Sequence, residues 1–336
     1  MAMPRFSRSG SPILLIALPG LLHCQQSAWR DPSPHAVQFV AVTGNVRLEV
    51  LDWGGTGSAV VLLAGGGDTA HVYDEFATKL TASYHVYGIT RRGFGASGFS
   101  ATDDPAARLG DDVVAVIDAL KLRRPVLVGH SLGGVELSSV ANRHRDRVAG
   151  LVYLDAAYSY AFDNGKGADM MEMQKLKAPP PPAPGVADLA SFSAFTKYNE
   201  RINGFRFPEA ELRQQRESTP SGEVGKERDF PGAKLFMPLL TGTRKYTDIP
   251  APAVVIFANP HSLGIWANGI TDPAVRAAVT SYTSALAGLT ERQIRAVKNG
   301  VTTTHVVTLP GAHHYVYLSN AADVIREMRD FVGRLK

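Results

Sequence analysis

The segment Gly129-His130-Ser131-Leu132-Gly133-Gly134 constrains the fold of this chain more than any other stretch. It follows an apolar run at residues 125–128 and precedes residues 135–144, which can form a helix. The pattern G-x-S-x-G between a strand and a helix is typical of a sharp turn that presents a serine as a nucleophile. Glycine at positions 129 and 133 fits such a turn, because the turn leaves no room for larger side chains there. Ser131 is therefore the candidate nucleophile.

Short apolar runs alternate with helical patterns through most of the chain. A hairpin is expected at residues 37–51, and further strands at 60–63, 84–89, 125–128, 148–154, 253–258 and 301–309. Helices are expected at 72–80, 109–121, 135–144 and 273–297, and after Ser319 or Asn320 as N-cap. This alternation predicts a single α/β domain over residues 35–336, built on a doubly wound, mostly parallel sheet.

The pattern breaks between residues 158 and 249, which predicts an inserted helical cap over the carboxyl edge of the sheet. A run of prolines at 179–182 is expected to be a stiff, extended spacer. Methionines at 170, 171 and 173 could line a pocket, but we favour the interpretation that they pack the cap against the body.

A serine hydroxyl needs a base within hydrogen-bond reach and an acid that orients the base. In a fold with this serine turn, the chain order is Ser, then Asp or Glu, then His. His313 and His314 both follow the last expected strand, so either could be the base.

The chain from about residue 37 to 335 resembles the α/β-hydrolase superfamily, in the esterase/lipase-like and proline-iminopeptidase-like group. The loop Gly311-Ala312-His313-His314-Tyr315 is similar to the G-x-G-H-[FY] loop of that group, which implies that His314 is the base. The segment Arg92-Gly93-Phe94-Gly95-Ala96-Ser97 resembles the R-G-x-G-x-S turn of the superfamily, and we interpret it as structural.

The acid is the least defined member of the predicted triad. In many members it follows the strand that corresponds to 253–258, but residues 259–264 contain no carboxylate, and Ser262 stands where an Asp is expected. Asp155 closes the strand after the serine helix. The segment Tyr153-Leu154-Asp155-Ala156-Ala157 that contains it resembles the L-D-P-A of pancreatic-type lipases. We therefore predict Asp155 as the acid, with Asp272 or a dyad without an acid as the alternatives.

An oxyanion hole needs two preorganised N–H donors. One is expected from the residue after the nucleophile, Leu132, and the other from the loop after strand 60–63. There Ala64-Gly65-Gly66-Gly67 replaces the H-G-x-[GP] of relatives, so the resemblance implies Gly66 as the second donor. A dinucleotide-binding loop is disfavoured, because no G-x-G-x-x-G is present.

Composition excludes several other classes of protein. With 45% hydrophobic and 20% charged residues and a formal charge of +4, the chain is ordinary for a globular protein. No basic, aromatic-interleaved cluster indicates nucleic-acid binding. No Cys/His cluster or carboxylate-rich loop suggests a metal, and no cofactor is expected.

The N-terminal segment has the layout of a secretory signal peptide. Arg5 and Arg8 precede an apolar run at residues 13–22, which is too short to span a bilayer as a helix. We expect residues 1–24 to be removed and the protein to be exported, or to be cytoplasmic if the segment is not a signal. Cys24 loosely fits a lipoprotein box, but His23 before it is not small, which argues against a lipid anchor.

These observations predict an exported serine hydrolase that acts on small-molecule esters through an acyl-enzyme intermediate. A proline-iminopeptidase-like aminopeptidase is an alternative, for which Glu200, Glu209 or Glu211 in the cap would hold the substrate amine. A non-catalytic ligand binder with the same fold is the other alternative. Haloalkane dehalogenases and epoxide hydrolases are disfavoured, because both need Asp at the position of Ser131.

Overall fold

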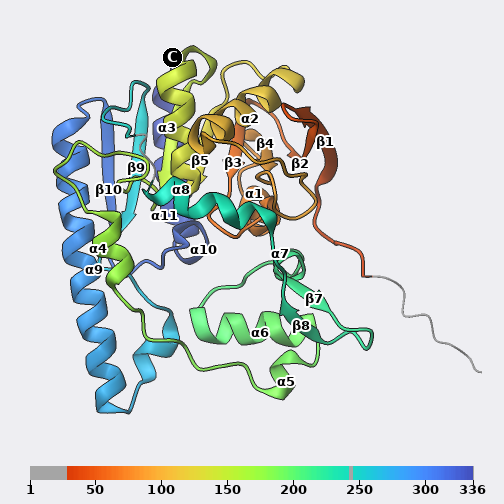
Figure 1. The fold of residues 1–336 in the computed structure, drawn as a ribbon, viewed down its shortest axis with the longest axis vertical. Helices are drawn as coiled ribbons and strands as arrows, with labels where there is room; N and C mark the ends of the chain where they lie inside the picture. The colour runs from red at the N-terminus through yellow and green to blue at the C-terminus, as the bar shows by residue number, and fades with distance from the viewer. Residues whose placement is uncertain (1–28, 242–244, 336) are drawn as a thin grey trace, which may run out of the picture. The chain divides into compact units, whose positions relative to one another are not determined.

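A computed structural model describes residues 29–241 and 245–335 (Figure 1). The chain divides into two units, residues 1–32 and 33–336, and the fold described here is that of the second. The predicted signal peptide and Cys24 lie outside the described residues. Among the described helices, none has both the length and the apolar character needed to cross a bilayer.

The centre of the second unit is a sheet of eight strands in the order β1-β2-β4-β3-β5-β6-β9-β10. Strands β1 and β2 form the predicted antiparallel hairpin, β2 also pairs antiparallel with β4, and all other pairs are parallel. The prediction of a mostly parallel α/β sheet is therefore confirmed. The strands are β1 (Ala36–Val42), β2 (Val46–Gly54), β3 (Ser58–Leu63), β4 (Tyr84–Ile89), β5 (Val126–His130), β6 (Gly150–Leu154), β9 (Ala253–Ala258) and β10 (Thr304–Leu309).

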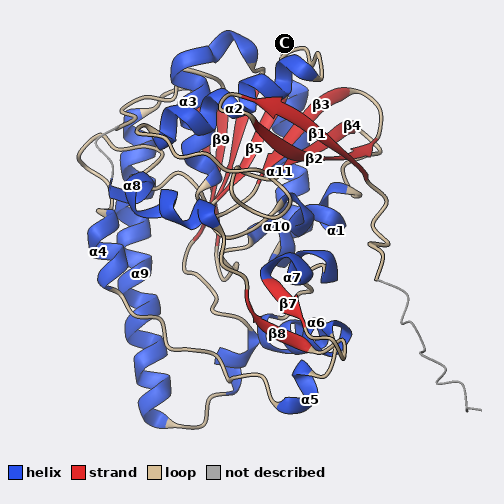
Figure 2. Ribbon diagram, turned by 45° about the vertical axis from the view of Figure 1, so that its right-hand side comes forward, coloured by secondary structure: helices blue, strands red, loops and turns tan. Residues whose placement is uncertain are grey.

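Both faces of the sheet are buried, and successive residues of each central strand enter opposite cores. In β3, Val61 and Leu63 pack in one apolar cluster, whereas Val60 and Leu62 pack in the other. Helices α2 (Pro105–Ala119) and α3 (Gly133–His144) cover the first face, and α1 (Asp74–Ala77) and α11 (Ala321–Arg334) the second (Figure 2). This two-sided burial explains why the strands are continuous apolar runs.

Several element boundaries differ from the sequence prediction. The helix expected at 72–80 is a 3-10 turn, η1 (Ala70–Tyr73), followed by the single turn α1. Helix α2 begins earlier than expected, because Asp104 caps it and Pro105 occupies its first position. Helix α9 (Pro273–Gly300) extends further than expected, so β10 begins only at Thr304. Asn320 precedes α11, but its side chain makes no capping hydrogen bond there.

The segment between β6 and β9 interrupts the alternation as predicted, but it is not purely helical. Strands β7 (Arg216–Ser218) and β8 (Val224–Glu227) form a separate antiparallel pair within it. These strands lie with α5, α6 and α7 in a lobe away from the main sheet (Figure 1). The helical elements are α4 (Met170–Lys175), α5 (Val186–Leu189), α6 (Phe192–Asn203), α7 (Glu209–Gln215), η3 (Pro231–Leu235) and α8 (Phe236–Thr241). The short helices η2 (Arg145–Arg147), η4 (Ile265–Gly269) and α10 (Val316–Ser319) complete the second unit.

Candidate active site

Ser131 lies in the sharp turn between β5 and α3 and has φ of +47°, in the left-handed region that non-glycine residues rarely adopt. The turn depends on small neighbours. A Cβ on Gly129 would lie 2.8 Å from the carbonyl oxygen of Gly133, and a Cβ on Gly133 would lie 2.7 Å from that of Leu63. The tight packing around the turn therefore holds Ser131 in a strained conformation at the carboxyl edge of the sheet.

Asp155 follows β6, the strand beside β5, and it also has a positive φ, +48°. Its carboxylate is fully buried and accepts four hydrogen bonds. Oδ1 accepts from the Tyr158 hydroxyl at 2.9 Å and from the Ala258 amide at 3.2 Å, while Oδ2 accepts from two imidazoles. Burial alone raises the pKa of Asp155, but His261 and His314 outweigh it and hold the pKa well below its usual range. Asp155 is therefore a buried carboxylate that stays ionised.

His314 lies in the loop after β10, and its Nδ1 is 2.6 Å from Asp155 Oδ2. A neutral His314 that donates from Nδ1 has an unprotonated Nε2, the atom that a general base uses. His130 also fixes this loop, because its Nε2 donates a hydrogen bond of 3.1 Å to the His314 carbonyl oxygen. His313, the alternative base, accepts the Tyr315 backbone N–H on Nδ1 instead. The structure thus brings His314, and not His313, to Asp155.

A second histidine, His261, also binds the carboxylate of Asp155, and the sequence analysis did not identify it. Its Nε2 lies 2.7 Å from Oδ2, and its side chain is 6% exposed. Burial lowers the pKa of His261, but the charge of Asp155 and the hydrogen bond to it outweigh burial, so the net pKa is raised. His261 lies in the loop after β9, where the sequence analysis sought an acid. The loop after β9 therefore supplies no acid of its own, but a histidine that binds Asp155.

The predicted oxyanion donors face the same space as Ser131. Gly66 and Leu132 line one cavity with Ser131 and His314. Within the described part of the chain, neither backbone amide donates a hydrogen bond to another protein group. Arg91 fixes the loop, because its guanidinium donates to the carbonyls of Ala64 and Gly65 at 2.7 and 2.9 Å. The Gly66 amide is thus positioned by the loop that Arg91 holds, and the Leu132 amide by the start of α3.

The cavity has a volume of about 480 Å³ and separates into a polar end and an apolar wall. The polar end holds Ser131, His261, His313 and His314. Helices α4, α8 and α9 supply the apolar wall, which consists of Met170, Met173, Phe236, Leu240, Tyr282 and Leu286. The interpretation that the methionines only pack the cap is therefore wrong for Met170 and Met173, because both line this cavity.

The sequence matches the alpha/beta hydrolase family over residues 60–327. The chain belongs to this family. Epoxide hydrolase A of Mycobacterium tuberculosis is 36% identical over 118 residues, which cover 33% of this chain and 36% of that protein. The chain matches the first curated relatives over 36–37% of their own length.

Solved structures of hydrolases share the fold over most of the chain. E-2-(acetamidomethylene)succinate hydrolase has a TM-score of 0.58 at 17% identity and covers 89% of this chain and 99% of its own. The carboxylesterase CesB of Bacillus subtilis has a TM-score of 0.53 at 16% identity, with coverage of 90% and 93%. At these identities the likeness shows the alpha/beta hydrolase fold alone.

Two tyrosines complete the polar end of the cavity in this alpha/beta hydrolase. Tyr158 binds Asp155 directly. Burial raises the pKa of the Tyr160 phenol, the charge of Asp155 adds to this, and a hydrogen bond with Ser131 partly offsets both. Tyr160 therefore stays neutral and bears a hydroxyl beside the candidate nucleophile. Neither tyrosine could be found from the sequence, because both lie in the irregular segment after β6.

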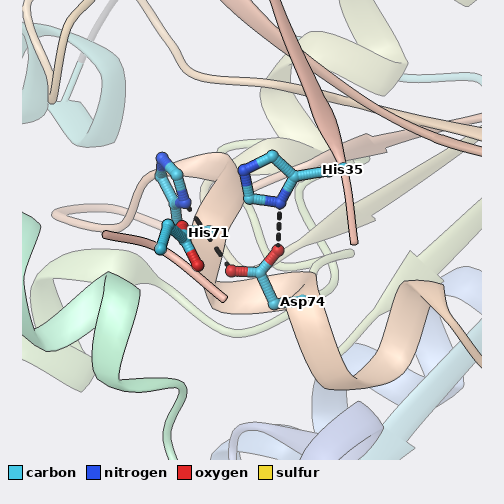
Figure 3. Close-up of side chains that lie close together, drawn as sticks. His35, His71 and Asp74 are labelled. Carbon is cyan, nitrogen blue, oxygen red and sulfur yellow. Dashed lines mark hydrogen bonds and ion pairs between the residues drawn. The ribbon is translucent and has the colours of Figure 1, made fainter. Parts of the chain in front are cut away.

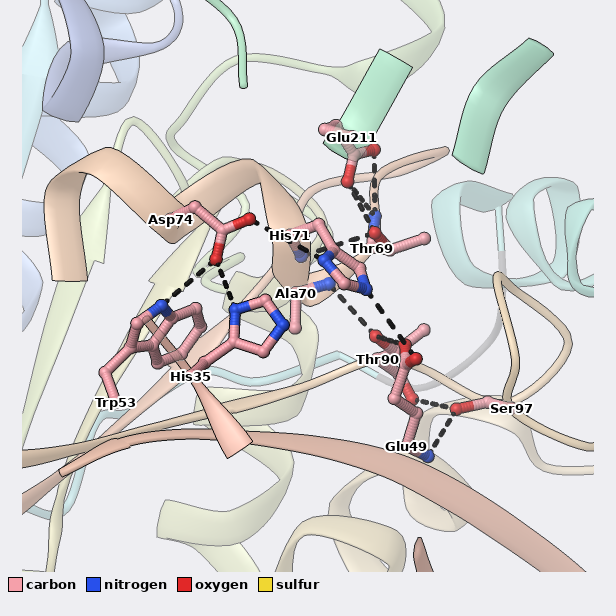
Figure 4. Close-up of polar contacts among 10 residues, drawn as sticks. All are labelled: His35, Glu49, Trp53, Thr69, Ala70, His71, Asp74, Thr90, Ser97 and Glu211. Atoms are coloured by element: carbon pink, nitrogen blue, oxygen red, sulfur yellow. Dashed lines mark hydrogen bonds and ion pairs between the residues drawn. The ribbon is translucent and has the colours of Figure 1, made fainter. Parts of the chain in front are cut away.

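Other carboxylates considered from the sequence lie away from this centre. Asp272 caps the start of α9, where it accepts the amide of Ala274. Glu200, Glu209 and Glu211 are absent from the lining of the cavity that holds Ser131. Glu211 is buried and accepts hydrogen bonds from both the amide and the hydroxyl of Thr69 (Figure 4). It therefore joins the inserted segment to the body.

Proposed function

We propose that the protein is a serine hydrolase that cleaves carboxylic ester bonds. The observation that carries this proposal is the bond of 2.6 Å between His314 Nδ1 and the buried carboxylate of Asp155, on the strand next to the Ser131 turn. Such an arrangement supplies a serine with a base in the correct tautomer. Ser131 also argues against the epoxide hydrolase reaction, for which an Asp would be needed at its position.

In the proposed reaction, Ser131 Oγ attacks the carbonyl carbon of the ester while His314 Nε2 accepts its proton. The carbonyl electron pair moves to oxygen, and the amides of Gly66 and Leu132 stabilise the resulting charge. When the intermediate collapses, the carbon–oxygen bond to the alcohol breaks and the alkoxide takes the proton from His314. Water then repeats the sequence on the acyl-enzyme and releases the carboxylic acid and free Ser131.

The cavity favours a substrate with an apolar group. Side chains from α4, α8 and α9 form a wall without a charged residue, beside the polar end that holds Ser131. An apolar pocket with a few convergent polar groups is typical of a small-molecule site. We infer that the acyl group of a small ester lies against this wall. Among the described residues that line the cavity, no carboxylate could hold the amine of an aminopeptidase substrate.

Labelling with a fluorophosphonate probe tests the proposal, with the Ser131→Ala variant as control. We expect the wild-type protein to be labelled and to hydrolyse p-nitrophenyl butyrate, and the variant to lose both properties. Its kcat should fall on the order of 10⁴–10⁶, as for other serine triads. Wild-type protein that neither labels nor hydrolyses the ester would support the ligand binder. Faster cleavage of prolyl p-nitroanilide than of the ester would support the aminopeptidase.

A further inference from the structure

A second group of histidine and acidic side chains lies outside the cavity that holds Ser131. His35 precedes β1, His71 belongs to η1, and Asp74 begins α1 (Figure 3). Each offers one ligand atom, and these atoms lie within 4.8 Å of one another. Their side chains are 3%, 6% and 4% exposed. From these contacts we propose that His35, His71 and Asp74 form a binding site for a zinc-like divalent cation.

The distances in the group suit a tetrahedral metal ion. His35 Nδ1 lies 2.8 Å from Asp74 Oδ1, and His71 Nδ1 lies 3.6 Å from Asp74 Oδ2. Donor atoms around a tetrahedral zinc ion with bonds of about 2.0–2.1 Å lie about 3.3 Å apart, between these two values. Both imidazoles turn Nδ1 toward the carboxylate, as Figure 3 shows.

Among the residues that the structure describes, one oxygen of the buried Asp74 carboxylate has no hydrogen-bond donor. Asp74 Oδ1 accepts hydrogen bonds from His35 Nδ1 and Trp53 Nε1. Within the described residues Asp74 Oδ2 accepts none, although it is buried. An unsatisfied buried carboxylate oxygen is costly, and it points toward His71 Nδ1 at a distance too long for a hydrogen bond. A cation between these two atoms would satisfy the buried oxygen of Asp74.

The surroundings of His71 also match those of a metal ligand. Histidines that bind metals usually direct their other ring nitrogen to a carboxylate or carbonyl, which fixes their orientation. His71 Nε2 lies 3.6 Å from Glu49 Oε1, and Glu49 Oε2 accepts the Thr90 hydroxyl at 2.7 Å (Figure 4). Glu49 thus holds His71 from the side opposite to Asp74.

Two imidazoles and one carboxylate are ligands that zinc accepts, whereas magnesium and calcium prefer oxygen. An ion bound here would link the chain before β1 to η1 and α1. These two elements follow the loop that carries Gly66. None of the three ligands lines the cavity of Ser131. The proposed role is therefore structural, and it departs from the sequence analysis, which found no metal signal.

Zinc content of the full chain tests the proposal. Protein stripped with a chelator, then incubated with Zn²⁺ and desalted, should retain one zinc per chain by mass spectrometry, and its Tm should rise. His71→Gln and Asp74→Asn should weaken zinc binding at least 100-fold and remove the rise in Tm. Glu49→Gln should weaken it about 10- to 100-fold. Mg²⁺ should neither bind nor raise the Tm.

Two controls separate this site from other histidines. His85 belongs to neither of the two described groups of His and Asp side chains, and its imidazole lies 2.8 Å from Asp52. The His85→Gln variant should therefore retain both the zinc and full ester hydrolysis. His314→Gln disrupts the other described group, Asp155, His261 and His314, and it should retain the zinc at the proposed site. Zinc lost only in His314→Gln would place the ion at the triad and overturn the proposal.

A measurement on the wild-type protein guards against misfolded variants. Co²⁺ bound in place of zinc should give the intense visible bands of a tetrahedral site, and added zinc should remove them. Retention of less than about 0.1 zinc per chain, or binding unchanged in His71→Gln and Asp74→Asn, would show instead that the group is a hydrogen-bonded cluster. Because the readouts are metal content and spectra, they do not depend on the proposed esterase activity.

Discussion

His261 and His314 both donate to the same oxygen of Asp155, at 2.7 and 2.6 Å. Both imidazoles line the cavity, but the side chain of His314, the proposed base, is 39% exposed, whereas that of His261 is 6% exposed. The carboxylate thus shares its charge between two rings from different loops. This arrangement makes specific predictions for each residue that contacts Asp155.

His314→Ala should reduce ester hydrolysis to the level of Ser131→Ala, because it removes the proton acceptor. His313→Ala should keep most of the activity, since His313 binds the Tyr315 amide and not Asp155. Steady-state kinetics with p-nitrophenyl butyrate measure both variants. If His313→Ala were inactive and His314→Ala active, the proposed base would be wrong.

Asp155→Asn should lower kcat by roughly 10²–10⁴ while the fold is retained, because an amide favours the wrong tautomer of His314. Circular dichroism should show native secondary structure for the variant. Asp272→Asn is the matched control and should leave kcat unchanged, since Asp272 only caps α9. Wild-type kcat in Asp155→Asn would argue for a dyad without an acid.

His261→Phe should lower kcat/KM about tenfold, because it removes an N–H donor that holds the Asp155 carboxylate in place. The groups that contact His261 are Asp155 and Tyr158, and His314 and His313 lie near it. Without His261, Asp155 Oδ2 loses one of its two N–H donors, so the carboxylate positions His314 less firmly. His261→Gln keeps an N–H donor and should stay within a few-fold of the wild type. Equal losses in both variants would contradict this positioning role.

Two buried carboxyl groups lie between the inserted segment and the body. Their contribution to the free energy of unfolding should fall as pH rises. Burial raises the pKa of Glu211 to about 8 and that of Asp68 to about 6. In the unfolded chain both are near 4, so the native state binds more protons between about pH 4 and pH 8. The contribution of these two groups to the free energy of unfolding must therefore decrease through this window.

Glu211→Gln should remove at least half of this decrease, measured by urea unfolding at pH 5.5 and 8. Glu209→Gln on the same helix is the control and should keep the full pH dependence, because Glu209 pairs with Arg213 near the surface. A pH dependence that is identical in wild type and Glu211→Gln would assign the effect to other groups.

Met173→Trp should fill the apolar side of the cavity and shift the preference toward short acyl groups. We expect the ratio of octanoate to acetate hydrolysis to fall tenfold or more, since each methylene in an apolar pocket contributes about 10- to 200-fold to discrimination. Met171→Trp on the same helix is the control, because Met171 is 47% exposed and does not line the cavity. An equal ratio in both variants would show that the acyl group lies elsewhere.

The sequence predicted the parts of the fold that depend on local patterns. Strands such as β3 and β9 were recognisable because burial on both faces makes them continuously apolar. The β7–β8 pair was missed, since its strands have only three and four residues and lack the continuous apolar run of the central strands. The helix expected at 72–80 was too long, because its apolar residues are divided between the 3-10 turn η1 and the single helical turn α1.

The candidate site divides in the same way. Ser131 followed from a motif of adjacent residues, whereas His261 contacts Asp155 across 106 positions of the chain. No local spacing indicates such a contact. The group of His35, His71 and Asp74 is also hard to find from the sequence. His71 and Asp74 lie on consecutive turns, but His35 is 39 positions before Asp74 and only the fold brings it to them.

The hydrogen-bond ladder of the sheet continues past the ends of the central strands. The Ser131 amide donates to the Leu154 carbonyl, and the Asp155 amide donates to the Ile256 carbonyl. The backbones of the nucleophile and the acid thus extend the sheet, whereas the pairing of the loops after β9 and β10 ends at His313, one residue before the base. On moderate heating, activity should be lost through displacement of His314 while Ser131 and Asp155 keep their spacing. Stabilising the loop at residues 311–315 is therefore the economical route to a more heat-tolerant catalyst.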